Sequence, residues 1–484
     1  MIEGFHVGRH ALREILVRAV ESSKRIHRDL VKLLGDDKVS NIVTDLAVYS
    51  HDYTPINLHK ILNLDLETIP CVVVWPESVQ DVVEIVKYAY ENHVPIYPYG
   101  GGSGVLRGFA PEHCGIVVDM KRMQSISLNE YDLTVAADAG VYGVILEQYL
   151  NYKGYTLGHI PQSLYESTVG GWIATRATGQ FSTKYGGIED LLLGIEVVVP
   201  PGRIVKLEPH PRTATGPDLR RLFIGSEGVL GIVTKATLKI AQFPEKRVKL
   251  SFATKTFEEA FEYTRLIIRR GVRPAVVRIY DRIETLRHFY WIRDVKDEPI
   301  TIMVIEGPSS LVDAEADIVK GTFKGRELGE EPVDYWLRTR FVVKEASEYA
   351  ALGFVFDTIE VAALWSRVVP LYREVIEAMK RVDGTLVASA HASHFYPQGA
   401  CLYFTFGGLP RAGTTPYEYH RKVWEAAMDA VIRVGGTISH HHGVGRIRAP
   451  WLKAEIGDAG LELLQKLKRA IDDRGIMNPG NMGL

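Results

Sequence analysis

The stretch SHHHGVGRIRAPWL, from Ser439 to Leu452, places three histidines in a row, His440, His441 and His442, just before a glycine. Histidine changes charge near neutral pH and is a common metal ligand, so this run indicates acid–base chemistry or metal binding. In an extended backbone neighbouring side chains point to opposite faces, and only His440 and His442 would converge. Two nitrogens make an incomplete metal site, so no bound metal is expected here.

Three glycine-rich segments lie in the first half of the chain. PYGGGSG places Gly100, Gly101 and Gly102 after an expected strand, where missing Cβ atoms let backbone amides approach phosphate oxygens. A tight turn without a ligand is the alternative for this segment alone, because neither GxGxxG nor the P-loop motif is present. The segment 158–186 mixes glycines with hydroxyl groups that suit a pyrophosphate and a ribose, and 224–240 places more glycines before an apolar strand. Three such segments are hard to explain as turns.

Composition describes an ordinary globular protein. The 484 residues are 46% apolar and carry a formal charge of −2, which allows two or three domains and gives no sign of a nucleic-acid partner. Cys71, Cys114 and Cys401 are far apart and form no CxxC pair, which argues against a zinc knuckle, an iron–sulfur site or a secreted disulfide framework. No secretory signal or membrane span is expected, so we predict a cytoplasmic protein that could touch a membrane surface.

The expected elements fall into two regions. An amphipathic helix is predicted over 11–34, followed by a strand at 71–76, a helix at 78–93 and a strand at 94–99 that runs into the first glycines. Strands are expected between 114 and 140, a helix at 144–153, and a hairpin at 195–207 with its turn at Pro200, Pro201 and Gly202. After Pro244, strands alternate with amphipathic helices, which suggests a separate α+β domain. A last helix is expected over 459–475, ending at Gly475, before a turn at Asn478.

These motifs, in this order, resemble the FAD-binding domain of the vanillyl-alcohol oxidase superfamily, also called the PCMH type. Within it the likeness is to the alkyldihydroxyacetonephosphate synthase family, which makes the ether bond of ether lipids. The most specific motifs are RTATGPD (212–218), SHFYPQGACLYFTF (393–406) and GGTISHHHGVGRIRAPWL (435–452). The likeness extends from about Val43 to Pro479.

The resemblance implies an α+β fold: a two-subdomain FAD-binding domain and a mixed α/β cap domain with an antiparallel sheet. The expected divisions are an N-terminal helical segment over 1–64, the FAD-binding domain over 65–241, the cap over 242–431, and a C-terminal segment over 432–484 that returns to the flavin. A homodimer is the expectation from the family.

The cofactor implied is FAD, bound without a covalent bond, because the glycine loop 100–104 has no histidine or cysteine where some relatives attach the ring. The residues expected to hold it are Pro98, Gly100, Gly101, Gly102, Ser103, Gly104, Pro161, Gln162, Ser163, Thr168, Gly170, Gly171, Thr175, Ala177, Gly179, Tyr185, Gly186, Glu227, Gly228, Gly231, Ile232 and Val233.

The chemistry implied is an exchange at the flavin without net redox change, in which the fatty acid of an acyl-dihydroxyacetone phosphate leaves and a long-chain alcohol takes its place. Such an exchange needs a group that moves a proton, donors for the leaving carboxylate and a cation for the phosphate. Tyr396 and the histidines at 440–442 match the first two tasks.

For the anion we favour Arg340 in YWLRTRF; Arg338 would share its face on a strand and diverge from it on a helix. His159 resembles the family's histidine near the flavin, and a structural histidine is an equal alternative. Arg446 and Arg448 are expected at an FAD phosphate or in solvent. Tyr403 and Phe406 are expected in the core.

Two other functions compete with this exchange. The first is an FAD-linked dehydrogenase or oxidase of a 2-hydroxy acid such as lactate or glycolate. Relatives of that kind carry a metal-site pattern from which His394 survives here, but Pro397 and Cys401 stand where Asp and His would be needed. The second is a binding or scaffold role, which the dense polar residues around the expected flavin disfavour. The substrate is expected to be a lipid-like or organic-acid small molecule.

Overall fold

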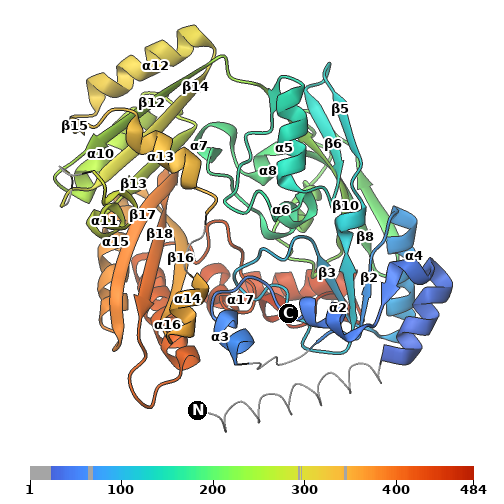
Figure 1. Cartoon of the computed structure of the whole chain (residues 1–484). Coiled ribbons are helices and arrows are strands. Elements are labelled where there is room, and N and C mark those ends of the chain that lie inside the picture. Colours follow the sequence, from blue (N-terminus) through green and yellow to red (C-terminus); the bar gives the residue numbers. More distant parts are fainter. Residues whose placement is uncertain (1–22, 64–68, 293–294, 296, 343–345) are drawn as a thin grey trace.

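The computed structural model describes residues 23–63, 69–292, 295, 297–342 and 346–484. Two β-sheets in the first half of the chain lie on one side of the molecule, and a larger sheet lies on the other (Figure 1). The predicted α+β class with an antiparallel cap sheet is confirmed. The divisions predicted between domains remain predictions.

The first sheet has the order β1-β2-β4-β3, with β1 at Val39–Ser40, β2 at Val72–Val74, β4 at Ile116–Asp119 and β3 at Ile96–Tyr99. The strands β2, β4 and β3 run parallel, and α4 (Val79–Asn92) makes the crossover between β2 and β3. The hydroxyl of Ser78 accepts the amide of Asp81 and fixes the start of α4. The strand β3 therefore delivers the first glycine loop at its carboxyl end.

The second sheet is antiparallel, in the order β5-β6-β10-β8-β9. The hairpin predicted at 195–207 is present as β8 and β9, joined by a turn with a cis Pro200–Pro201 bond. The bounds are β5 Ile126–Asn129, β6 Thr134–Asp138, β10 Ile232–Lys239, β8 Leu192–Val199 and β9 Arg203–Leu207, with a small pair β7 Tyr155–Thr156 and β11 Ala241–Gln242.

The cap sheet is antiparallel, in the order β15-β12-β14-β13-β17-β18-β16. Its strands are β15 Arg326–Glu327, β12 Lys246–Ala253, β14 Ile300–Gly307, β13 Val276–Tyr280, β17 Thr385–Phe395, β18 Gly399–Gly408 and β16 Val355–Leu364. The helices α10 (Phe257–Arg269), α15 (Trp365–Lys380) and α16 (Pro416–Val434) share a hydrophobic core with alternate residues of these strands, for example Val277 and Ile279 of β13. The residues between them face the other half of the molecule.

The other helices are distributed over both halves, and a helix over 23–34 packs against the first sheet. Their bounds are α2 Val43–Val48, α3 Asn57–Leu62, α5 Gly143–Tyr152, α6 Val169–Thr175, α7 Ser182–Tyr185, α8 Ile188–Leu191, α9 Arg220–Phe223, α11 Arg282–Phe289, α12 Ser309–Thr322, α13 Glu331–Thr339, α14 Ala346–Ala351 and α17 Ala449–Ile471. No helix in the described part of the chain is both long and apolar enough to cross a membrane.

The last helix, α17, lies between the two halves of the molecule in Figure 1. It ends at Ile471, not at Gly475 as predicted, because the Asp472 carboxylate accepts the backbone amides of Ile476 and Met477 and turns the chain back. The amide of Asn478 then donates to the carbonyl of Ile96 in β3. The C-terminal segment is thus fixed beside the first glycine loop.

The amino-terminal part of the helix predicted over 11–34 lies outside the described residues, as 11–22. The spacing of the cysteines gave no sign of a disulfide, whereas Cys71 and Cys114 form one across 43 residues. They precede the parallel neighbours β2 and β4, which start side by side with Cα atoms 5.0 Å apart. Cys401 is a buried free thiol, and the cytoplasmic location remains a prediction.

Candidate active site

A cavity of about 960 Å³ lies between the glycine segments and the inner face of the cap sheet. All of the residues predicted to hold the cofactor line it except Gly179, Tyr185 and Gly186. Gly179 packs against the backbone of His159 and Ile160, the Tyr185 hydroxyl donates to Glu306, and Gly186 follows α7 with a φ of +87°. These three residues shape the surrounding structure and lie outside the cavity lining.

The two glycine segments fit a bound FAD because their backbones lie against each other along the cavity. A Cβ atom at Gly101 would collide with the carbonyl oxygen of Glu166, and one at Gly100 with the hydroxyl of Thr168. The Thr168 hydroxyl accepts the amide of Gly171 and begins α6 at the cavity wall. Bare amides and a helix start that border one cavity are suited to the diphosphate of a dinucleotide.

Strand alternation determines the cap side of the cavity. On β17 and β18, Ala390, Ala392, Leu402 and Phe404 belong to the helix-covered core, so the residues between them point inward. The inward residues of three neighbouring strands pair in register as His391, Tyr403 and Glu360. Phe406 is in the core as predicted, whereas Tyr403 is not: its ring stacks on His391 with centroids 4.8 Å apart, and it lines the cavity.

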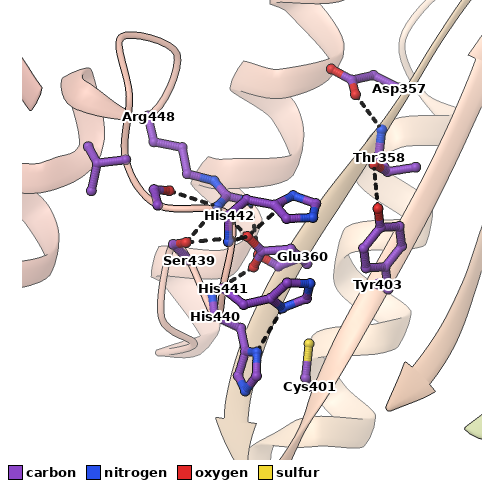
Figure 2. A network of polar contacts seen from close by, with 12 residues as sticks. Asp357, Thr358, Glu360, Cys401, Tyr403, Ser439, His440, His441, His442 and Arg448 are labelled. Carbon is purple, nitrogen blue, oxygen red and sulfur yellow. Dashed lines mark hydrogen bonds and ion pairs between the residues drawn. The ribbon is translucent and has the colours of Figure 1, made fainter. Parts of the chain in front are cut away.

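The segment 435–448, here called the histidine loop, joins α16 to α17. Glu360 of β16 holds this loop in place (Figure 2). The Glu360 carboxylate accepts the backbone amides of His440 at 2.6 Å and His442 at 2.7 Å. It also pairs with Arg448 at 2.7 Å, and Glu360 and Arg448 are both fully buried. One carboxylate therefore fixes the backbone of the loop at two points.

Burial alone would raise the pKa of Glu360, but Arg448, His442 and the amide hydrogen bonds outweigh it and lower the pKa to about 2. Arg448 is thus an internal counter-ion, and its predicted place at an FAD phosphate or in solvent is wrong. Arg446 donates to the carbonyls of Ala110 and Pro479, so it too binds the chain itself.

Glu227, predicted to hold the cofactor, lines the cavity and also fixes the far end of the loop. Its carboxylate accepts the amides of Val444 at 2.5 Å and Gly445 at 2.9 Å. Gly443 has a φ of +87°, and a Cβ atom there would crowd the same carboxylate. The histidine loop is therefore held by one carboxylate from each half of the molecule.

The expected extended backbone at the histidines is wrong, because the chain bends there. His440 and His441 face each other with Nδ1 atoms 2.8 Å apart, and the Tyr396 hydroxyl lies 2.8 Å from His440 Nε2. His442 turns the other way, with Nδ1 3.5 Å from a Glu360 oxygen. The bend thus links Tyr396, His440 and His441 in one hydrogen-bonded chain, and His441 lines the cavity.

Burial keeps these histidines neutral. It lowers the pKa of His440 to about 4 and the pKa of His441 far below its usual value, with neighbouring histidines adding to the effect on His441. Burial raises the pKa of Tyr396, so its hydroxyl stays protonated. Each imidazole can then accept a proton from one neighbour while it donates one to another.

His394 joins this group from β17, where a bulge gives it a φ of +53°. Its Nδ1 lies 2.7 Å from the Ser182 hydroxyl, and its ring stacks on His440 with centroids 5.0 Å apart. One nitrogen each from His394, His440 and His441 lie within 4.8 Å of one another, a set that could hold a divalent metal ion. The sequence argument paired His440 with His442, whereas the fold brings His440 together with His441 and His394.

His159 lies behind the cavity wall. It is fully buried against Trp172, with ring centroids 4.6 Å apart, and neither ring nitrogen has a hydrogen-bond partner among the described residues. Burial lowers its pKa to about 3. His159 is therefore a neutral ring that supports α6 from behind.

Arg340 follows the end of α13, so it and Arg338 point in different directions, and Arg338 is exposed. The Arg340 guanidinium packs over Phe181, Trp336 and Phe341, and burial lowers its pKa to about 10. Arg340 itself does not line the cavity, whereas its neighbour Phe341 does.

Sequence reasoning missed three residues on the inner face of the cap sheet: Arg278, His391 and Glu360. Arg278 and Glu360 are single charges inside the apolar strands AVVRIYD and TIEVAAL. A lone charge in such a strand signals an inward-facing polar group, because the flanking apolar residues must occupy the opposite face.

Comparison with known proteins finds matches to both halves of the chain. Residues 70–208 match the FAD binding domain, and 243–482 match the C-terminal domain of FAD linked oxidases. The chain is 31% identical to an alkyldihydroxyacetonephosphate synthase of Caenorhabditis elegans, over 94% of this chain and 83% of the relative. An uncharacterized FAD-linked oxidoreductase of Escherichia coli is 31% identical, over 94% and 97%.

A glycolate oxidase subunit of Bacillus subtilis is 27% identical, over 95% of this chain and 97% of the relative. A solved alkyldihydroxyacetonephosphate synthase superposes with a TM-score of 0.77 at 25% identity, covering 94% of this chain and 85% of that one. The chain therefore belongs to the FAD-linked oxidase family of the vanillyl-alcohol oxidase type, as an alkyldihydroxyacetonephosphate synthase-like flavoenzyme that binds FAD.

Proposed function

We propose that the enzyme exchanges the acyl chain of an acyl-dihydroxyacetone phosphate for a long-chain alcohol and releases the fatty acid. The observation that carries the proposal is the hydrogen-bonded chain Tyr396, His440 and His441, which reaches the cavity as neutral groups. The bound flavin would supply the nucleophile that holds the substrate carbon while the fatty acid leaves and the alcohol adds, and the residues of the chain move the protons.

The chain of hydrogen bonds can run in either direction. When Tyr396 donates to His440 Nε2, His440 donates through Nδ1 to His441; when a proton enters at His441, every bond in the chain reverses. An exchange removes a proton from the substrate carbon and later returns one, so a reversible relay suits it. Low pKa values keep the imidazoles free to accept the proton at neutral pH.

The cavity margin supports a lipid-like substrate. Leu58 and Ile61 of α3 and Phe341 and Val342 beyond α13 line its outer part, and Ile61 and Val342 are exposed. Apolar side chains at this edge give an acyl chain a place to lie, and they would be the point of contact with a membrane surface. Peripheral membrane contact and a homodimer belong to this proposal.

A second candidate is an FAD-linked oxidation of a 2-hydroxy acid, and the cluster His394, His440 and His441 favours it. Three imidazoles within 4.8 Å could hold a divalent metal that binds the hydroxyl and carboxylate of such an acid. A neutral histidine would then take the hydroxyl proton. The B. subtilis relative named as a glycolate oxidase subunit supports this alternative.

The deciding experiment is anaerobic. The purified yellow protein is mixed with a panel of D- and L-2-hydroxy acids while the oxidised flavin band is followed, and separately with acyl-dihydroxyacetone phosphate and deuterated hexadecanol. We expect no bleaching by any acid, and we expect deuterated alkyl product and free fatty acid in equal amounts by mass spectrometry. Bleaching by one acid without any exchange product would replace our proposal by the second candidate. Tyr396→Phe serves as the inactive control for the exchange.

A further inference from the structure

Arg278 lies on the inner face of the cap sheet. Its neighbours on β13, Val277 and Ile279, belong to the helix-covered core, so the guanidinium points to the opposite side and lines the cavity. Among the residues that the structure describes, no other arginine or lysine lines this cavity. The enclosed space thus contains one permanent positive charge.

The guanidinium is held by neutral partners. Its Nε donates to the Tyr280 hydroxyl at 2.9 Å, and its Nη2 lies 2.5 Å from His391 Nε2. Arginine only donates, so His391 Nε2 accepts, and its proton must sit on Nδ1. That nitrogen faces the buried carboxylate of Glu284 at 4.0 Å. His391 therefore orients Arg278, and the Glu284 carboxylate lies on the opposite side of the imidazole.

No carboxylate lies within ion-pair distance of Arg278 among the described residues, and its Nη1 has no hydrogen-bond partner there. Arg448, which lies at the end of the histidine loop, is by contrast neutralised by Glu360. A charge that is positioned by hydrogen bonds but left without a counter-ion in a cavity is prepared for an anion.

We propose that Arg278 is the anion-binding residue of this cavity and receives the oxyanion group of the substrate, a phosphate or a carboxylate. This inference rests on the proposed function, which requires a cation for the substrate phosphate, and it places that role at Arg278. Arg340, the residue favoured by sequence, is covered by Phe181, Trp336 and Phe341 outside the cavity lining. The Nε and Nη1 atoms of Arg340 have no hydrogen-bond partner among the described residues, so Arg340→Met tests the competing position.

The test measures binding without turnover. Holoenzyme is titrated by calorimetry with glycerol 3-phosphate and, separately, with glycerate, its carboxylate counterpart. In Arg278→Met we expect the Kd of the preferred anion to rise about 10- to 100-fold, the effect of losing charge-assisted hydrogen bonds. Arg278→Lys keeps the positive charge but loses the two parallel N–H donors of the guanidinium, so it should give a smaller rise in Kd. It replaces Arg278→Met in the test if the methionine variant fails to fold. Arg340→Met should bind like the wild type. Flavin content and Tm check the integrity of each variant.

The inference is overturned if Arg278→Met binds both anions as the wild type does, if Arg340→Met alone weakens binding, or if the wild type binds neither anion. Preference for glycerol 3-phosphate assigns the subsite to a phosphate, and preference for glycerate assigns it to a carboxylate; either supports the inference. If binding depends on Arg278 but no acyl–alkyl exchange occurs, the anion site stands and the proposed function fails. If exchange occurs while Arg278→Met leaves anion binding unchanged, the proposed function stands and the anion site at Arg278 fails.

Discussion

Replacing Glu360 by glutamine tests whether one buried carboxylate organises the active-site loop. The substitution keeps the size of the side chain but removes the charge that pairs with Arg448 at 2.7 Å. It also weakens the acceptor for the amides of His440 and His442. The variant therefore has an unpaired buried guanidinium and a loop held by weaker hydrogen bonds.

Two routes give the size of the effect. A carboxyl whose pKa falls from 4.5 to about 2 on folding contributes roughly 3 kcal/mol at neutral pH. Breaking one side of a buried ion pair costs about 3–5 kcal/mol. With about 2–4 °C in Tm for each kcal/mol in a domain of about 150–250 residues, a loss of about 3 kcal/mol lowers Tm by roughly 6–12 °C.

The assay is thermal unfolding of the holoenzyme between pH 3 and 8, with turnover measured in parallel. Because the pKa of Glu360 is lowered by folding, its contribution is present above the ordinary value of 4.5 and is lost as the pH falls toward 2. The wild type and Glu360→Gln should therefore differ most near neutral pH and converge in acid. Turnover should fall even where the variant is fully folded, because His440 and His442 lose their alignment.

Glu455→Gln is the control, since the Glu455 carboxylate accepts the amide of Ile438 in the same loop but is exposed. It should change Tm by less than about 2 °C. The double variant Glu360→Gln with Arg448→Met removes the unpaired charge and should recover part of the stability. A Glu360→Gln enzyme with wild-type Tm and turnover would refute the reasoning.

Four further outcomes are expected. Tyr396→Phe should keep its flavin and its Tm but lose about 100-fold in turnover; loss of flavin instead would make Tyr396 structural. Since burial lowers the pKa of His440 to about 4, turnover should stay constant from pH 8 to about 5 and fall near pH 4 as the imidazole is protonated; a fall near pH 6.5 would contradict this. Gly101→Ala should purify with little flavin, whereas Gly321→Ala, where nothing lies within 4 Å, should keep it; equal flavin contents would remove Gly101 from the cofactor site. Acid precipitation should release all the flavin into the supernatant, and colour in the pellet would show a covalent bond.

Local sequence patterns predicted those parts of the fold that depend on a single strand, helix or glycine loop. The β-α-β unit around α4, the hairpin at Pro200 and the alternation beyond Pro244 follow from apolar periodicity and turn residues. The glycine segments likewise indicated the cavity, because only bare backbone can pack as closely as Gly101 does against Glu166.

Contacts between residues far apart in the sequence could not be predicted from the sequence. The disulfide depends on β2 and β4 being parallel neighbours, and the bend at the histidines depends on Glu360, 80 residues earlier. The role of Arg448 could not be read either, because its counter-ion Glu360 lies on β16, far away in the sequence. Such contacts are set by the topology of the sheet and leave little trace in local composition.

Neighbouring residues along the cap strands face opposite sides of the sheet, so they are under different selective pressures. Positions that face the helices, such as Val277 and Leu402, determine whether the cap folds, and the positions between them, such as Arg278 and Tyr403, determine what the cavity accepts. A change in substrate therefore requires substitutions at every second residue and leaves the packing of the sheet intact. One cap scaffold can in this way serve different substrates within a single family.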